Sequence, residues 1–231
     1  NESWKNPNEY FKNNFNSKID LVSNLKSLKF LKKYIYIGTP EIFGSSDKKI
    51  DEYSTNYSPS TPYALSKLSM ELLLESYYKN FKSNVIIARF SNFYGRYQPF
   101  HRLIPKTIYS ILKKQKFPLQ GSGTSKRDFI FDEDTNEALY SVIKKGKIGK
   151  KYHFSSNKLF RIKDIINIIC KKLNYKYSKL VYKVPDRVGK DNNYNLSCLK
   201  TKKELNWKSK KSLYLGINQT IKFYKKVLNY D

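Results

Sequence analysis

Two short apolar runs in the first half of the chain predict buried strands that end in polar loop residues. Residues 34–37 read Tyr-Ile-Tyr-Ile and lead into Gly38, Thr39, Pro40 and Glu41. Residues 85–90 read Val-Ile-Ile-Ala-Arg-Phe and lead into Ser91 and Asn92. Short apolar runs bounded by turn residues are typical of strands that are covered on both faces. Loops at the ends of such strands are where α/β sheets bind their ligands.

Between and after these strands, apolar residues recur at helical spacing. The pattern predicts helices over residues 9–28, 63–81, 103–114, 134–145, 162–173 and 213–228. Residues 128–131 and 152–154 read as further strands, residues 117–120 as an extended segment, and residues 176–195 as the least regular stretch. Alternating strands and helices predict an α/β fold with a Rossmann-like, doubly wound parallel sheet.

Tyr63 and Lys67 are four residues apart at the start of the predicted helix 63–81, directly after Pro62. Residues at this spacing lie on one face of a helix. An ammonium group beside a phenol stabilises the phenolate, so we expect Lys67 to lower the pKa of Tyr63 from its usual value near ~10. A tyrosine tuned in this way takes and returns protons near neutral pH.

Further motifs follow one another in a fixed order from the first residue to Trp207. They are Asn1-Glu2-Ser3-Trp4, Thr39-Pro40-Glu41-Ile42-Phe43-Gly44, Ser60-Thr61-Pro62-Tyr63 with Lys67, Arg89-Phe90-Ser91-Asn92-Phe93-Tyr94-Gly95, Leu103-Ile104-Pro105, Arg127-Asp128-Phe129-Ile130, Asp186-Arg187-Val188-Gly189 and Glu204-Leu205-Asn206-Trp207. With these motifs the chain resembles the extended short-chain dehydrogenase/reductase family, and within it the nucleotide-sugar 4,6-dehydratases of the dTDP-glucose type.

The resemblance implies NAD as cofactor, a nucleotide-diphosphate sugar as substrate, no metal, and a homodimer as the assembly. It implies a catalytic set of Thr39, Glu41, Tyr63 and Lys67. Tyr63, Lys67 and Asn14 would contact the cofactor, although a solvated polar face is an alternative for Asn14. The substrate would be bound by Asn92, Leu103, Arg127 and Arg187.

Arginine placement supports a diphosphate substrate, because a guanidinium makes two-point contacts with phosphate oxygens. Three of the six arginines, Arg89, Arg127 and Arg187, lie in or just before matching motifs. An ion pair with Asp128 or Asp132 is the alternative for Arg127.

Glu41 decides the reaction class that the resemblance implies. Once the sugar is oxidised to a 4-ketose, a carboxylate can remove the acidic C5 hydrogen and expel the 6-hydroxyl. Dehydratases of the dTDP-glucose type carry Asp before this Glu as the acid, but the chain has Pro40, which donates no proton. A 4-epimerase, a UDP-glucuronate decarboxylase and an inactive sugar-nucleotide-binding remnant are therefore alternatives.

The glycine-rich loop that receives the dinucleotide pyrophosphate at a helix N-terminus is not found before residue 90, where Gly38 and Gly44 are the only glycines. The resemblance therefore implies a C-terminal fragment of a longer enzyme, with ~80 residues preceding it on the usual strand layout. We expect residues 1–94 and 126–156 to form a partial NAD-binding domain. Residues 95–125 and 157–231 would form the smaller α/β substrate domain.

The net charge of +26 on 231 residues would suit a polyanionic partner. However, the excess comes from 39 Lys against 6 Arg spread along the whole chain, whereas base recognition relies on Arg. We therefore expect no specific nucleic-acid partner. The sequence has no apolar run of the ~18 residues that a membrane span needs, so we expect no membrane contact and a cytoplasmic location. Cys170 and Cys198 read as buried structural thiols.

Overall fold

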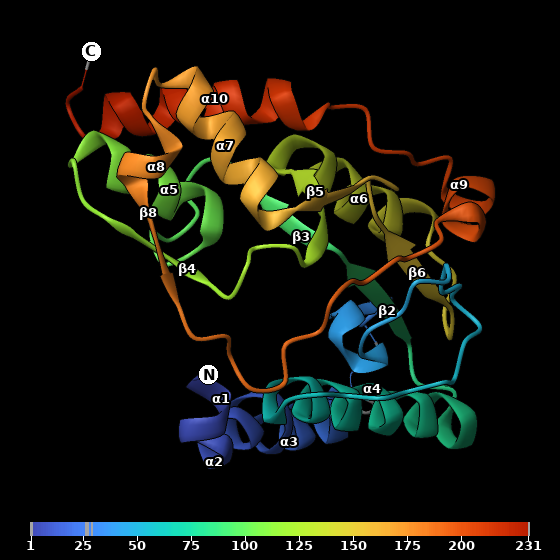
Figure 1. Ribbon diagram of the computed structural model, residues 1–231. Coiled ribbons are helices and arrows are strands. Elements are labelled where there is room, and N and C mark those ends of the chain that lie inside the picture. Colours follow the sequence, from blue (N-terminus) through green and yellow to red (C-terminus); the bar gives the residue numbers. More distant parts are fainter. Residues whose placement is uncertain (1, 26–27, 29, 231) are drawn as a thin grey trace.

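A parallel sheet forms one half of the protein, which is seen as a computed structural model describing residues 2–25, 28 and 30–230 (Figure 1). Its order is β1-β2-β6, with β1 at Tyr34–Gly38, β2 at Val85–Phe90 and β6 at Lys151–Phe154. Tyr34 lies opposite Val85 on β2, and Ile87 lies opposite Lys151 on β6. The predicted α/β class and both predicted strands of the first half are confirmed.

The other elements follow the chain between and after these strands. They are α1 (Glu2–Lys5), α2 (Pro7–Phe11), a π-helix η1 (Lys12–Asn16), α3 (Ser17–Leu25), a 3-10 helix η2 (Pro40–Phe43), α4 (Pro62–Phe81), β3 (Asn92–Tyr94), α5 (Leu103–Leu112), β4 (Phe117–Gln120), β5 (Lys126–Phe131), α6 (Asp132–Lys145), β7 (Leu159–Arg161), α7 (Ile162–Lys172), α8 (Tyr177–Leu180), β8 (Val181–Val184), α9 (Leu199–Leu205) and α10 (Leu213–Val227).

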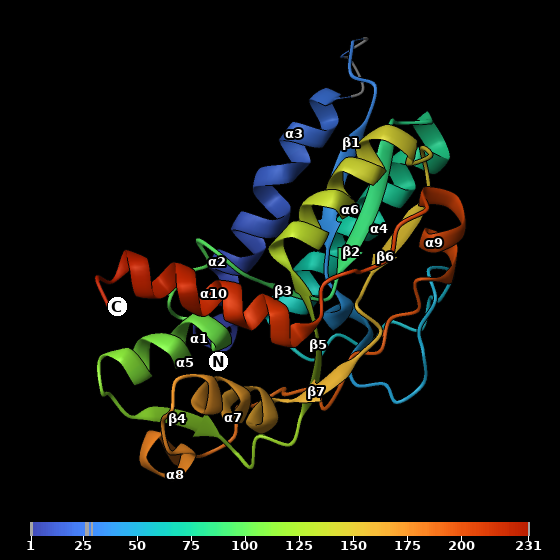
Figure 2. The ribbon, with the colours of Figure 1, turned by 90° about the horizontal axis from the view of Figure 1, so that it is seen from above.

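The side chains of β2 alternate between the two faces of the sheet, and a helix covers each face. Val85 and Ile87 share a buried cluster with residues of α4, whereas Ile86 and Ala88 share one with residues of α6. This alternation with period two is the strand geometry. All residues of β2 are buried as a result, which explains why the strand reads as one continuous apolar run. The two covering helices make the sheet doubly wound, as predicted (Figure 2).

The predicted helix over residues 9–28 is interrupted and shorter. Helix α2 passes into the π-turn η1 and then into α3, which ends at Leu25, and Leu28 is not helical. Residues 26 and 27 lie outside the described residues. Three asparagines in η1 account for the interruption, because Asn is a poor helix former whose side chain competes for backbone hydrogen bonds.

Residues 176–195 contain more regular structure than the sequence predicts. Helix α8 and strand β8 lie in this stretch, and β8 pairs in parallel with β4. The apolar pattern could not predict β8, because its four residues are only half-buried or exposed and the strand forms by pairing with β4. The short strands β3 and β7, which flank β5 in a third sheet, were missed for the same reason.

A second apolar core lies among α5, α7 and α10, outside the parallel sheet (Figures 1 and 2). It contains both strand and helix residues from 94 onward and includes the thiol of Cys170. Cys170 and Cys198 are both buried and free, as predicted. The indole of Trp207 packs instead in the core between β2 and α6, with its ring centroid 4.9 Å from that of Phe154. The division into two domains stays a prediction, and Trp207 shows that residues 157–231 also contact the parallel sheet.

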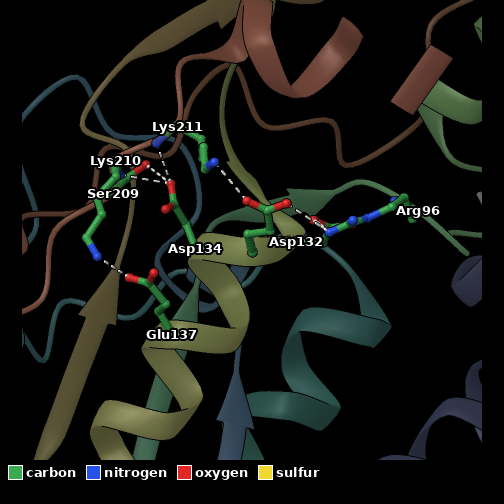
Figure 3. A network of polar contacts seen from close by, with 8 residues as sticks. Arg96, Asp132, Asp134, Glu137, Ser209, Lys210 and Lys211 are labelled. Atoms are coloured by element: carbon green, nitrogen blue, oxygen red, sulfur yellow. Dashed lines mark hydrogen bonds and ion pairs between the residues drawn. The ribbon is translucent and has the colours of Figure 1, made fainter. Parts of the chain in front are cut away.

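A clasp around Asp134 fastens the segment between α9 and α10 to the start of α6 (Figure 3). The carboxylate is 1% exposed, and its Oδ2 accepts hydrogen bonds from Ser209 Oγ at 2.7 Å and from the backbone N–H groups of Lys210 at 3.0 Å and Lys211 at 2.9 Å. The negative charge also lies in the first turn of α6, where it interacts favourably with the positive end of the helix dipole. One side chain therefore holds two distant segments together.

Replacing Asp134 by alanine should lower the free energy of unfolding by about 3 kcal/mol, because it removes the charged acceptor that three part-buried hydrogen bonds share. Glu137 is the matched control on the same helix. It pairs with Lys210 at 2.7 Å, but its side chain is 50% exposed, so Glu137→Ala should cost less than about 0.5 kcal/mol. Urea denaturation of both variants tests this, and equal losses would contradict the role of the clasp.

Among the described residues, no helix is both long and apolar enough to cross a membrane.

Candidate active site

The start of α4 places Tyr63 at the site. Thr61 has an extended backbone, and its Oγ1 accepts a hydrogen bond from Ala64 N at 3.1 Å, which caps the helix. Pro62 follows at the first helical position, where its missing N–H costs nothing. The sequence Thr-Pro therefore fixes where the helix begins. It also fixes Tyr63 in the first turn and Lys67 one turn later.

The end of β1 brings two more predicted residues to Tyr63. Thr39 is buried and caps η2, with its Oγ1 accepting a hydrogen bond from Glu41 N at 3.3 Å. The Thr39 side chain also hydrogen-bonds to Tyr63, and the charge of Glu41 acts on the same phenol. Thr39, Glu41 and Tyr63 thus lie together and form a candidate catalytic cluster.

Burial raises the pKa of Glu41 above its ordinary value. Arg187 and Arg127 oppose this rise, Asp191 adds to it, and Arg102 opposes it. A carboxyl with a raised pKa among arginines is suited to proton transfer at neutral pH. Two of the predicted substrate residues, Arg127 and Arg187, therefore act on the predicted base.

The pKa of Tyr63 moves opposite to the prediction. Burial raises it to about 12, the Glu41 charge adds to the rise, and the hydrogen bond with Thr39 opposes it. The expectation that Lys67 lowers this pKa is wrong for the chain as it stands. The reason is that Lys67 Nζ donates a hydrogen bond to Ile37 O at 2.6 Å and lies 4.2 Å from the ring centroid of Tyr36. Its charge is directed to β1 instead of the phenol.

Asn14 reaches the same helix from η1. Its Nδ2 donates a hydrogen bond to Ser66 Oγ at 3.1 Å, and Ser66 directly precedes Lys67. The predicted alternative of a solvated polar face is therefore wrong for Asn14. π-turns occur frequently at functional sites because they redirect single side chains.

Residues 1–155 match the NAD dependent epimerase/dehydratase family. The chain belongs to this family.

Individual members of the epimerase/dehydratase family match much of the chain. A dTDP-D-glucose 4,6-dehydratase of Homo sapiens is 35% identical over 202 residues, which make up 84% of this chain and 57% of the human protein. The chain thus spans less than two thirds of that relative. The crystal structure of a dTDP-glucose 4,6-dehydratase from Streptomyces venezuelae with NAD and TYD bound superposes with a TM-score of 0.92 at 26% identity, covering 97% of this chain and 69% of that one.

A UDP-glucuronic acid 4-epimerase from Bacillus cereus shares the fold of the present chain. The TM-score is 0.86 at 24% identity, over 93% of this chain and 68% of the epimerase. The fold therefore does not distinguish dehydratases from epimerases. That distinction depends on the residues of the site.

In the present chain, Arg127 is buried and holds the segment that follows β8. Its Nη1 donates to Lys126 O and to Asn192 O, and its Nη2 donates to Asp191 O at 2.8 Å. The guanidinium also lies 4.5 Å from the ring centroid of Tyr194. The alternative of an ion pair with Asp128 or Asp132 is wrong. The Asp128 carboxylate accepts hydrogen bonds from Ser91 and Ser156, and Asp132 pairs with Arg96.

A strap formed by residues 189–197 lies along the loop between η2, which contains Glu41, and α4, which contains Tyr63. Ser60 Oγ donates to Asp191 Oδ2 at 2.8 Å, and Tyr194 OH donates to the same oxygen at 2.7 Å. Backbone hydrogen bonds from Ser46 N to Asn193 O and from Ile50 N to Asn195 O continue the contact. Two segments more than a hundred residues apart are thereby fixed beside Glu41.

The remaining predicted residues lie on neighbouring elements. Asn92 is half-buried at the start of β3, paired in register with Phe129, and Leu103 is the first residue of α5. Arg187 is exposed, and its backbone N–H donates to Asp186 Oδ1. Roles in substrate binding for these residues stay predictions. Arg89, in contrast, is fully buried against Glu71 and is removed from any phosphate.

Sequence reasoning missed Arg102 and Tyr194 as members of this site. The charge of Arg102 lowers the pKa values of both Glu41 and Tyr63, and the phenol of Tyr194 is influenced by Glu41 and Arg127. Arg102 directly precedes the Leu103-Ile104-Pro105 motif and is one of only six arginines, so its rarity was an available signal. Tyr194 is one of 20 tyrosines, so the sequence held no comparable signal for it.

Proposed function

We propose that the whole protein to which this chain belongs is an NAD-dependent nucleotide-sugar 4,6-dehydratase of the dTDP-glucose type. The observation that carries the proposal is the half-buried Glu41 carboxyl beside Tyr63 and Thr39, because oxidation at C4 needs the Tyr63 end of this cluster and elimination needs a second base. The dTDP-glucose 4,6-dehydratases among its relatives support the same reaction.

In the proposed first step, the Tyr63 oxygen accepts the proton of the sugar 4-hydroxyl, and Thr39 holds that hydroxyl through its own. When bound, NAD supplies the hydride acceptor and the positive nicotinamide charge. Since Tyr63 has a pKa of about 12 in this chain, it needs added positive charge beside it to become a base near neutral pH. The Arg102 charge already acts in this direction, whereas Lys67, one turn further along the same helix face, donates to Ile37 O in this chain.

In the proposed second step, Glu41 removes the C5 proton of the 4-ketose, and the 6-hydroxyl leaves with a proton as water. Arg127, Arg187 and Arg102 lower the pKa of Glu41 against the effect of burial, which keeps part of the carboxyl ionised and able to act as a base. Pro40 donates no proton to the leaving group. The acid for that step is not assigned to a residue.

The donors present fit one end of NAD. The phenol of Tyr63, the ammonium of Lys67 and the amide of Asn14 lie along one side of α4, and such donors suit the ribose hydroxyls and amide of a nicotinamide nucleoside. The described chain offers no glycine-rich loop before residue 90 for the pyrophosphate. We therefore assign Tyr63, Lys67 and Asn14 to the nicotinamide riboside half alone.

This chain by itself should bind NAD no tighter than about 1 mM, because the pyrophosphate contacts are missing. Isothermal titration calorimetry of the 231-residue chain measures the constant directly. A micromolar dissociation constant would contradict the assignment, since the chain would then hold the dinucleotide in another way.

We propose a nucleotide-diphosphate sugar as the substrate, with Arg187 and Arg127 at the diphosphate and ribose and with Asn92 and Leu103 at the sugar side. Arg127 already donates to three backbone carbonyls, so part of its contribution is to hold the strap. Because Arg187 is exposed, it is the arginine that a phosphate reaches without breaking existing contacts. No nucleic acid, membrane or metal takes part in this proposal, and the proposed location is the cytoplasm.

We also propose a homodimer formed through α4 and the helices before it. Leu65 and Leu72 on α4 are 45% and 46% exposed, and Trp4 on α1 is 49% exposed. Large apolar side chains gathered on one helix surface favour a second subunit as cover. Sedimentation of the whole protein at micromolar concentration should give a dimer, and Leu65→Glu with Leu72→Glu should give a monomer. A monomeric native protein would contradict this assembly.

Product analysis of the whole protein tests the reaction class. With dTDP-glucose and NAD we expect a 4-keto-6-deoxy sugar nucleotide that has lost one water, seen by mass spectrometry and NMR. A C4 epimer of unchanged mass would support the epimerase alternative, and a pentose formed from UDP-glucuronate would support the decarboxylase. No product from any of these substrates would support a binding remnant.

A further inference from the structure

A buried ion pair lies behind the carboxyl end of β1. Arg89 donates to Glu71 Oε2 from Nη2 at 2.7 Å and from Nε at 2.9 Å, and both side chains are 0% exposed. Burial raises the pKa of Glu71, and the charge and hydrogen bonds of Arg89 oppose the rise. A guanidinium stays charged in proteins, so the two short bonds fix Glu71 as its carboxylate partner. Such a pair is weak evidence for stability by itself.

The other contacts of Arg89 lock the guanidinium in place. Nη1 lies 3.1 Å from His153 Nε2, and burial together with the Arg89 charge holds the pKa of His153 well below its ordinary value. The neutral imidazole therefore accepts from Arg89. The guanidinium carbon also lies 5.0 Å from the ring centroid of Phe43 in η2. Arg89 thus fixes Glu71 relative to β6 and to the loop after β1.

The second oxygen of Glu71 is directed at Gly38, the last residue of β1, which directly precedes Thr39. Among the described residues, Oε1 is buried and has no hydrogen-bond partner. A Cβ atom added to Gly38 would lie only 2.4 Å from this oxygen, so the strand passes it at a distance that only glycine allows. A free carboxylate oxygen at the end of β1 is costly unless it has an electrostatic partner.

Two lysines of neighbouring elements interact electrostatically with this carboxyl: the Lys151 charge lowers the pKa of Glu71, and the Glu71 charge raises that of Lys67. Lys67 precedes Glu71 by one helical turn, which places the two Cβ atoms about 5–6 Å apart on one face of α4. The Lys67 ammonium donates to Ile37 O at 2.6 Å, and Glu71 lies against the next residue, Gly38. Both side chains therefore approach the same two residues of β1 from α4.

We propose that Glu71, anchored by Arg89, is the positioning residue that keeps Lys67 charged and directed at the carboxyl end of β1. The inference rests on the proposed role of Lys67 in cofactor binding, and it extends that role to residues that touch neither cofactor nor substrate. Burial lowers the pKa of Lys67 to about 8, Glu71 opposes this fall, and Lys18 on α3 adds to it. Without Glu71 the amine would lose its proton close to neutral pH.

In the part of the chain that the structure describes, the other titratable groups near Lys67 carry no charge at neutral pH. Burial raises the pKa of Tyr36, whose ring lies 4.2 Å from Lys67 Nζ on β1, and raises that of Tyr63 to about 12. Asn14 from η1 contributes a neutral amide, which donates a hydrogen bond to Ser66, the residue before Lys67. Among the described residues, Glu71 and Lys18 are thus the charged groups that act on Lys67, and Arg89, Lys151 and Glu75 act in turn on Glu71.

Competitive labelling of lysines with acetic anhydride over pH 6 to 11, read by mass spectrometry of the Lys67 peptide, measures the Lys67 pKa in this chain without cofactor or activity. In Glu71→Gln the pKa should fall by about one unit or more. In Lys18→Gln it should rise. Glu75→Gln is the matched control one turn further along α4, where the carboxylate pairs with Lys151 at 2.7 Å, and it should leave the value unchanged.

A second variant covers the case in which Glu71→Gln does not fold around the unpaired Arg89. Glu71→Leu with Arg89→Met replaces the pair by apolar side chains of similar size, a change that folded proteins tolerate. The Lys67 pKa should fall in this variant as well. An unchanged Lys67 pKa in either folded variant would overturn the proposal and leave Glu71 with a packing role. The outcome is independent of whether the whole protein is a dehydratase.

Discussion

Replacing Glu41 by glutamine should slow elimination by the whole protein by ~10²–10⁴-fold, the usual loss when a general base is removed. Glutamine keeps the size of the side chain and the hydrogen bond from its own N–H to Thr39 Oγ1, so the cluster retains its shape. Oxidation at C4 depends on Tyr63, Thr39 and Lys67, and it should continue. The variant should therefore accumulate a 4-keto-hexose nucleotide, which rapid quenching and mass spectrometry detect.

The matched control is Glu137→Gln, because Glu137 is half exposed on α6 and pairs with a surface lysine. It should turn over as the native protein does. Normal turnover by Glu41→Gln would mean that Glu41 has a structural role. The epimerase alternative would then be favoured, since simple 4-epimerases need no second base.

Removing the phenol hydroxyl with Tyr63→Phe should lower turnover by a similar ~10²–10⁴-fold, but at the first step. The ring stays in place, because it packs edge-on against Tyr10 with ring centroids 6.0 Å apart. Tyr10→Phe is the matched control, since it keeps this packing and changes a hydroxyl outside the catalytic cluster. Neither the 4-keto-hexose nor the product should form in Tyr63→Phe, as assayed by the same quench method. Accumulation of the 4-keto-hexose would contradict the role of Tyr63.

The parallel sheet and α4 could be predicted from sequence because their signals are local. β2 is apolar at every position since both faces are covered, and Thr61-Pro62 is a strong start signal for a helix. Strand β8 could not be predicted, because its few half-exposed residues become a strand only beside β4. The local sequence pattern shows which strands are buried and where helices begin. Whether a half-exposed segment forms a strand depends on a pairing partner that is distant in the sequence.

The candidate site shows the same division. The structure places Thr39, Glu41 and Tyr63 together, and their catalytic roles stay predictions, whereas spacing alone gave the wrong direction for the Tyr63 pKa. Four-residue spacing fixes which helix face Lys67 lies on, and it does not reveal that Ile37 O is the acceptor. Arg89 was grouped with the phosphate-binding arginines for its motif. Only the fold places it against Glu71, eighteen residues earlier in the chain.

Rapid mixing with absorbance in the reduced-nicotinamide band tests most directly the claim that Tyr63 and Glu41 serve two successive steps. With the whole protein, NAD and dTDP-glucose, the native protein should show a transient rise and fall as hydride moves to the cofactor and returns to C6. Glu41→Gln should show the rise without the fall, and Tyr63→Phe should show neither. Loss of the rise in Glu41→Gln as complete as that in Tyr63→Phe would contradict the account, because the two residues would then serve a single step.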